Sequence, residues 1–201
     1  MAKQYRSKYS SNSNTNTIVI LAIVIAFSII LATVIAIAQP KGGGGTTSGQ
    51  VPQEDVVQSY KTQLQNNPND ITVRTNLGHA YFEQGMFYYQ KNDNRMGEKF
   101  NLAISEYIQV IKQNPKDKSV LGNLATCYFY TGRTDDAIRE VKKALEIDPK
   151  FEPALLNYAI YLSANQQFDA AITELKKISP TSSNYGQAQQ LISDFSKQSG
   201  K

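Results

Sequence analysis

The feature that most constrains the fold is a regular spacing along the chain. Pro115 and Pro149 lie 34 residues apart, and each follows a segment with the apolar periodicity of a helix. Between the two prolines, one apolar stripe covers residues 121–128, Gly132 interrupts it, and a second stripe covers residues 137–145. The pattern therefore predicts two antiparallel helices that are separated by a glycine turn and closed by a proline.

The same pattern recurs on both sides of this segment, in the same phase. The earlier copy opens at Asn76 with NLGHAYFEQG, and the later copy reads NYAIYLSANQQFDAAITELKKI over residues 157–178. The later copy has Gln166 where the turn glycine is expected and Ser183 where the closing proline is expected. Because the last unit of a repeat array is commonly atypical, we interpret this copy as a terminal repeat.

The segment NLATCYFYTGRTDDAIREVKKALEIDP, residues 123–149, resembles the tetratricopeptide repeat (TPR) family, whose period is 34 residues. The resemblance covers residues 54 to about 180 and implies an all-α TPR superhelical solenoid of about three and a half repeats. The expected TPR domain covers residues 54–198. Its parts are a half repeat over 54–68, full repeats over 71–115, 118–149 and 152–183, and a capping helix over 184–198.

The first full repeat departs from the family pattern. The stretch from Gly85 to Ala103 is thirteen residues longer than the pattern allows, yet both apolar stripes continue through it. The turn sequence Asn-Asp-Asn at residues 92–94 lies between them. We therefore predict a hairpin with both helices lengthened by about two turns. The aromatic residues 87–89 either pack inside this hairpin or form a contact surface for a partner or a membrane interface.

The resemblance also implies a concave groove lined by the first helix of each repeat, in which we expect a protein or peptide partner to bind. The candidate groove residues are Thr72, Thr75, His79, Phe82 and Glu83, then Ser119, Gly122, Thr126, Phe129 and Tyr130, then Pro153, Leu156, Ile160, Ser163 and Ala164. Family members that clamp a peptide C-terminal carboxylate use groove lysines and an arginine. Those basic residues are missing from the matching positions here, which disfavours that type of clamp.

Residues 18–38, IVILAIVIAFSIILATVIAIA, contain no charged side chain. As a helix this run is about 31 Å long, close to the thickness of the hydrocarbon core of a bilayer. We therefore predict a transmembrane helix, with the lipid bilayer as its partner. A cleaved signal peptide is the alternative, because Ala36-Ile37-Ala38 matches a cleavage site, but the apolar run is longer than a signal peptide requires.

The charges around this run predict its orientation. Lys3, Arg6 and Lys8 precede it, whereas only Lys41 follows it closely. Positive charge stays on the cytoplasmic side, so residues 1–17 are expected to form a polar cytoplasmic tail. Residues 39–53 are expected to form a Gly-rich flexible linker to an extracytoplasmic TPR domain. The predicted localisation is the cell membrane, with a single pass.

Composition argues against other functions. Residues 51–201 are formally neutral, which is unlike the basic surface of a nucleic-acid-binding domain. The chain has one histidine, His79, and one cysteine, Cys127, so we find neither a catalytic set nor a set of metal ligands. The run of glycines at residues 42–45 lacks the residues of a phosphate-binding loop. We predict a protein without enzymatic activity, cofactor or metal.

These observations together predict a membrane-anchored adaptor or scaffold that binds a protein or peptide in its concave groove. Two alternatives remain open. One is an assembly factor for an envelope complex, of the pilus or cytochrome-maturation type. The other is a repeat scaffold that self-assembles into a homo-oligomer through its repeats.

Overall fold

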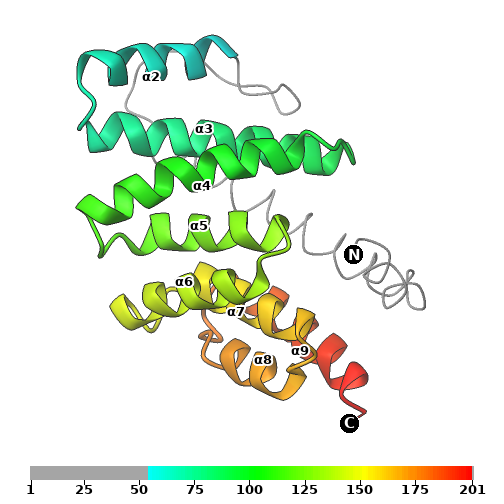
Figure 1. Cartoon of the computed structure of the whole chain (residues 1–201). Helices are drawn as coiled ribbons and strands as arrows, with labels where there is room; N and C mark the ends of the chain where they lie inside the picture. Colours follow the sequence, from blue (N-terminus) through cyan, green and yellow to red (C-terminus); the bar gives the residue numbers. More distant parts are fainter. Residues whose placement is uncertain (1–53, 201) are drawn as a thin grey trace. The chain divides into compact units, whose positions relative to one another are not determined.

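The computed structural model describes residues 54–200, and all of their regular secondary structure is helical (Figure 1). The helices are α2 (Glu54–Asn66), α3 (Ile71–Gln90), α4 (Met96–Gln113), α5 (Lys118–Tyr130), α6 (Thr134–Ile147), α7 (Glu152–Ala164), α8 (Phe168–Leu175) and α9 (Tyr185–Gln198). The prediction of an all-α fold is confirmed for this part of the chain. The predicted tail, transmembrane helix and linker, residues 1–17, 18–38 and 39–53, lie outside the described residues.

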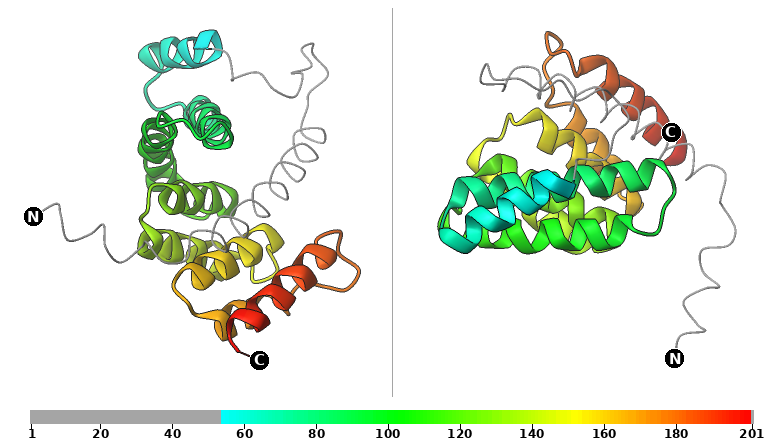
Figure 2. Two further views of the ribbon diagram at one scale, coloured as in Figure 1. Left: turned by 90° about the vertical axis from the view of Figure 1, so that its right-hand side faces the viewer. Right: turned by 90° about the horizontal axis from the view of Figure 1, so that it is seen from above.

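The helices pack as successive hairpins. Helices α3 and α4, α5 and α6, and α7 and α8 pair within hairpins, while α4 contacts α5 and α6 contacts α7. Helix α2 packs on α3 at one end of this series, and α9 packs on α8 at the other, as Figure 2 shows from two directions. Each hairpin therefore buries its apolar side chains against its neighbours in the chain, which is the packing expected of a helical repeat array.

All three hairpin turns contain one residue in the left-handed backbone conformation: Asn92 (φ 52°), Gly132 (φ 78°) and Gln166 (φ 60°). In each turn the amide of the following residue donates to the carbonyl five residues earlier, at 2.8–2.9 Å. This hydrogen bond ends the first helix and redirects the chain, and glycine is the residue best suited to that conformation. The third hairpin thus forms the same turn as the second, although Gln166 replaces the glycine.

The first full hairpin is longer than the others. Helix α3 has 20 residues against 13 in α5, and α4 has 18 residues against 14 in α6. The prediction of about two extra turns in each helix is confirmed for α3, but it is wrong for α4, which is longer by about one turn. The two helices approach closely, because Gly78 and Gly85 leave room for the rings of Tyr107 and Phe100.

A polar link connects a residue near the start of each hairpin's first helix to a residue 30–32 positions later. The links are Arg74 to Glu106, Lys118 to Asp148, and Glu152 to Ser182 and Asn184. Lys118 and Glu152 are the first residues of α5 and α7, whereas Arg74 is the fourth residue of α3 and pairs with Glu106 within α4. The three links engage most of the charged side chains of α3, α5 and α7.

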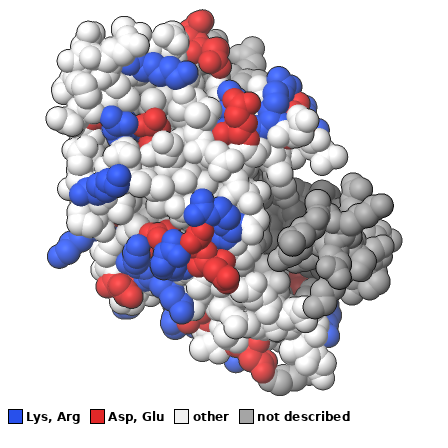
Figure 3. Space-filling model, viewed as in Figure 1, with Lys and Arg blue, Asp and Glu red and all other residues white. Residues whose placement is uncertain are grey.

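Basic and acidic side chains are interspersed on the face of the molecule drawn in Figure 3. This distribution agrees with the formal neutrality of residues 51–201. Within residues 54–200, no helix combines the length and the apolar character needed to cross a bilayer.

Candidate partner-binding site

The predicted groove residues all lie on α3, α5 and α7, the first helices of the hairpins, but they differ in accessibility. Exposed residues are Thr72, Ser119 and Ala164, and half-buried ones are Thr75, His79, Glu83, Phe129, Tyr130, Pro153 and Ser163. Buried residues are Phe82, Gly122, Thr126, Leu156 and Ile160. The exposed and half-buried side chains are the ones available to a partner, whereas the buried ones contribute to packing between the helices.

The largest feature near these residues is a continuous series of ring contacts, which we call the aromatic ladder: Phe82, Tyr89, Phe100, Phe129, Tyr130 and Tyr161. Tyr130 lies at its centre, stacked on Phe100 with the ring centroids 5.1 Å apart. The ladder connects α3 and α4 to α5 and then to α7. It therefore crosses three successive hairpins.

Three members of the ladder are accessible. Tyr89, Phe129 and Tyr130 are half-buried, whereas Phe82, Phe100 and Tyr161 are buried beneath or between the helices. Burial raises the pKa of both Tyr89 and Tyr130, so their phenol groups are neutral at physiological pH. These rings offer apolar area together with a hydroxyl group, a combination that is common at protein–protein interfaces.

The three aromatic residues 87–89 differ in burial and in the rings that they contact. Tyr88 is buried, with the Arg95 guanidinium 4.2 Å from its ring centroid, and Phe87 packs edge-on against Tyr88. Tyr89 instead contacts Tyr130 of the next hairpin, with the ring centroids 4.6 Å apart. Tyr89 was not among the predicted groove residues, because the repeat pattern ends before the lengthened part of α3. Extending the helical period through the aromatic run could have identified it.

A buried polar group joins the second and third hairpins beneath the ladder. The Thr126 hydroxyl lies 3.1 Å from the Tyr161 hydroxyl, and the Asn157 side-chain amide donates to Thr126 at 3.3 Å. Thr126 also donates to the Gly122 carbonyl. Since its hydroxyl is buried and engaged, Thr126 holds adjacent hairpins together in this structure.

Most charged side chains of the first helices are engaged within the fold, by ion pairs or by hydrogen bonds. Helices α3, α5 and α7 carry four charged side chains: Arg74, Glu83, Lys118 and Glu152. Three of them make the links described above. His79 is half-buried, and desolvation lowers its pKa despite the opposing influence of Asp117, so it is neutral at physiological pH. Among the described residues, Glu83 accepts no hydrogen bond and pairs with no cation.

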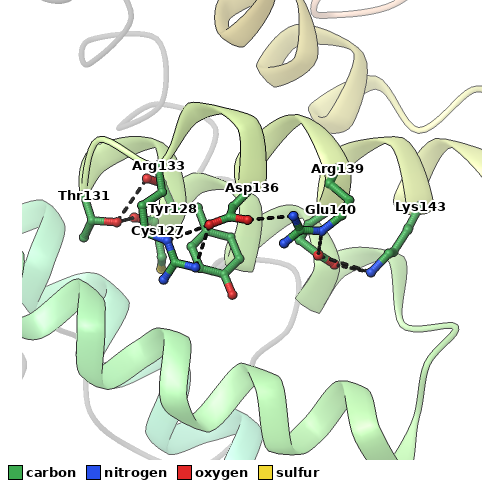
Figure 4. Close-up of polar contacts among 8 residues, drawn as sticks. All are labelled: Cys127, Tyr128, Thr131, Arg133, Asp136, Arg139, Glu140 and Lys143. Atoms are coloured by element: carbon green, nitrogen blue, oxygen red, sulfur yellow. Dashed lines mark hydrogen bonds and ion pairs between the residues drawn. The ribbon is translucent and has the colours of Figure 1, made fainter.

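Helix α6, the second helix of the second hairpin, differs from α3 because its acidic side chains Asp136 and Glu140 are paired with cations. In α6, Asp136 lies between Arg133 and Arg139, and Glu140 lies between Arg139 and Lys143, as Figure 4 shows. Glu140 is only 5% exposed but is matched by these cations. A hollow of about 270 Å³ adjoins Glu140 between α4, α5 and α6, with Ile108, Ile111 and Leu124 among its lining residues. The acidic side chains Asp136 and Glu140 of α6 are thus satisfied internally.

Two features of the described residues concern thiol reactivity and metal binding. Burial raises the pKa of the Cys127 thiol well above its ordinary value, so the thiol stays protonated and packs as a small apolar group. Within residues 54–200, no three His, Cys, Asp or Glu side chains are placed to hold a metal ion together. The arrangement is one suited to binding through rings, hydroxyls and a single carboxylate.

Comparison with known proteins agrees with the fold. A family model described as "Tetratricopeptide repeat" matches residues 131–194. A tetratricopeptide repeat protein from Parabacteroides merdae superposes with a TM-score of 0.59 at 20% identity, covering 73% of this chain and 55% of that one. The TPR2B domain of yeast Sti1 in a pHsp70 complex gives 0.50 at 23% identity, covering 60% and 97%. The described helices have the tetratricopeptide-repeat fold.

Among curated proteins, Hsp70-Hsp90 organizing protein 2 of Arabidopsis thaliana is 27% identical over 131 residues. The match covers 53% of this chain but 22% of that protein. The chain therefore spans about a fifth of the length of this relative.

Proposed function

We propose that this tetratricopeptide-repeat protein is an adaptor that binds a peptide segment of a protein partner along α3, α5 and α7. The observation that carries the proposal is the aromatic ladder, whose accessible rings Tyr89, Phe129 and Tyr130 follow one another across successive hairpins. A row of partly exposed aromatic rings on rigid helices provides contact area at low conformational cost. A peptide laid across several repeats would contact these rings in turn.

The similarity to Hsp70-Hsp90 organizing protein 2 and to the Sti1 domain in its pHsp70 complex supports peptide binding as the general role. A clamp for a terminal carboxylate requires free cations. Here the two cations of α3, α5 and α7 are engaged, since Arg74 pairs with Glu106 and Lys118 pairs with Asp148. The partner proposed for this chain is therefore held by aromatic and hydroxyl contacts.

We also propose that residues 18–38 anchor the protein in the cell membrane, with the repeats on the extracytoplasmic side. The support is in the sequence: an uncharged run of sufficient length, with Lys3, Arg6 and Lys8 before it. The protein would hold its partner close to a bilayer, without turnover of its own. An envelope-complex assembly factor is a more specific form of this role, and self-assembly through the repeats is the competing one.

The binding role can be tested by crosslinking and affinity purification of the full-length chain from its native membranes. The double variant Phe129→Ala/Tyr130→Ala removes two accessible rings of the ladder. Tyr60→Ala/Tyr185→Ala removes two half-buried rings of α2 and α9, outside the first helices, and is the matched control. Circular dichroism establishes that each variant is folded. We expect the partner to be lost from the first variant and retained by the control. Equal recovery with both would reject the aromatic ladder as the binding surface.

A further inference from the structure

The proposed binding role leaves open what kind of peptide the groove selects, and the charges of the first helices bear on this question. Resting on that proposed function, we propose that Glu83 binds a lysine or arginine side chain of the partner, so that the groove selects a basic segment. A terminal carboxylate would then be disfavoured at this place rather than recognised.

Glu83 differs from the other charged side chains of the first helices in its partners. In α3, α5 and α7, the side chains of Arg74, Lys118 and Glu152 link each first helix to a residue 30–32 positions later. Glu83, which lies on α3, makes no such link. Among the residues that the structure describes, it has neither a hydrogen-bond donor nor a cation beside it. Among the described residues of the first helices, Glu83 is therefore the charged side chain with neither a cation nor a hydrogen-bond donor.

The environment of the Glu83 carboxylate also bears on its role. Glu83 is half-buried, and desolvation raises the pKa of its carboxyl group. It is close enough to Tyr107 of α4 to contribute to the raised pKa of that phenol, although burial is the larger cause. A carboxylate removed in part from water, without a partner, is unfavourable in the free protein. A cation supplied by a ligand would reverse that cost on binding.

The surroundings suit a long basic side chain. His79 lies one turn before Glu83 in α3 and is neutral, and the carboxylate of Asp117 is near enough to influence it. Glu83 is the thirteenth residue of α3, and the accessible ladder ring Tyr130 is the thirteenth residue of α5, so the two hold equivalent positions in successive repeats. The methylene groups of a lysine or arginine can pack on rings while the charged end reaches a carboxylate. Charge complementarity and the aromatic ladder thus favour the same class of peptide.

A two-part measurement tests the inference on the full-length chain kept in detergent. An array of ten-residue peptides with amidated C-termini, varied systematically in the number of lysine and arginine residues, first establishes what the chain binds. Fluorescence anisotropy with the best peptide then compares the wild type with Glu83→Gln, Glu83→Lys and the control Glu146→Gln. Glu146 is an exposed carboxylate on the second helix α6. The control removes the same charge from a different surface.

We expect binding on the array to rise with basic content. We expect Glu83→Gln to weaken binding about tenfold, the effect of losing one charge-assisted hydrogen bond. Glu83→Lys should abolish the preference for basic peptides, and Glu146→Gln should leave the affinity unchanged. Peptide binding that is indifferent to basic content, or equal in wild type and Glu83→Gln, would overturn the role of Glu83 while leaving the adaptor function in place. If the wild type binds no peptide on the array, the adaptor function fails as well.

Discussion

At the scale of single residues, the close approach of α3 and α4 depends on the absence of a side chain at two positions. A Cβ atom at Gly78 would lie 2.7 Å from the Tyr107 ring, and one at Gly85 would lie 2.7 Å from the Phe100 ring. Tyr107 and Phe100 are both 0% exposed, so neither ring can move into solvent. The two glycines are seven residues apart and so lie on one face of α3.

Replacing Gly85 by alanine should destabilise the protein by about 1–3 kcal/mol, because overpacking in a filled core outweighs the gain in helix propensity. Gly97→Ala is the matched control, since a Cβ atom there meets nothing within 4 Å. We expect the control to be neutral or slightly stabilising. Urea unfolding of both variants measures the difference, and equal midpoints would show that α3 and α4 are not closely packed at Gly85.

Replacing Thr126 by valine keeps the shape of the side chain but removes its hydroxyl. The hydroxyl of Tyr161 and the side-chain amide of Asn157 would then lose a hydrogen-bonding partner in a buried place. We expect a loss of about 1–3 kcal/mol in the free energy of unfolding. Thr126→Ser retains the hydroxyl and should recover most of this loss. A valine variant as stable as the wild type would show that these contacts do not contribute.

The raised pKa of Glu83 has a consequence for stability. Its carboxyl group holds a proton more tightly in the folded protein than in the unfolded chain. The contribution of Glu83 to stability therefore falls as the pH rises from its ordinary pKa through its raised one, and it stays low above that interval. Glu83→Gln removes this effect. In the absence of ligand, we expect the variant to be more stable than the wild type at pH 7.5 but not at pH 3.5.

Thermal unfolding at the two pH values checks this prediction, with Glu146→Gln as the control. His79 titrates in both proteins, so the difference between variant and wild type isolates Glu83. A stabilisation that is the same at both pH values would contradict the assigned environment of the carboxylate.

The sequence alone could not predict which of the candidate groove side chains are buried. Repeat positions identify the face of a helix, but they do not say how large the neighbouring residue is. Thr126 occupies a groove position by register, yet Tyr161 of the next hairpin covers it. The isolated charge of Glu83 likewise becomes visible only once the partners of Arg74, Lys118 and Glu152 are known.

At the scale of the helices and turns, the third hairpin shows how packing overrides local preference. Its turn contains Gln166 in the left-handed conformation at φ 60°, where the second hairpin has Gly132 at φ 78°. A residue with a Cβ atom is strained in that conformation by about 1 kcal/mol or more. The hydrogen bonds of the turn are nevertheless the same in both hairpins. Packing of the helices on either side therefore imposes the turn on an unfavourable residue.

Gln166→Gly should consequently stabilise the protein by about 0.5–1 kcal/mol, because it removes the strain of the left-handed conformation. Gly132→Ala, the opposite change in the equivalent turn, should destabilise it by about 1 kcal/mol. Chemical denaturation of the two variants provides the test. Changes of the same sign in both would mean that the backbone conformation is not what distinguishes these turns.

The helices could largely be predicted from the sequence, and their unequal lengths could not. The apolar stripes and the turn at residues 92–94 indicated a longer first hairpin. They did not show that the extension is greater in α3 than in α4, because the periodicity does not determine where a helix ends. Helix α4 begins only at Met96, after a turn in which Asp93 accepts a hydrogen bond from the Arg95 amide.

At the scale of the whole molecule, the repeat architecture explains why a sequence pattern was enough to predict the fold class. Each hairpin packs mainly on the hairpins next to it in the chain. The structure is therefore determined by short-range patterns repeated at a fixed interval, rather than by contacts between distant segments. The function depends instead on what the repeats place side by side, and the sequence pattern alone does not reveal those contacts.

The central claim is that the partner lies along the first helices. Site-specific photocrosslinking in whole cells tests it most directly. The photoreactive residue is placed at the exposed positions Thr72 and Ser119 of first helices, or Lys112 and Lys142 of second helices. We predict that one partner, identified by mass spectrometry, is crosslinked from Thr72 and Ser119 but not from Lys112 or Lys142. A partner captured from the second helices alone would contradict the account.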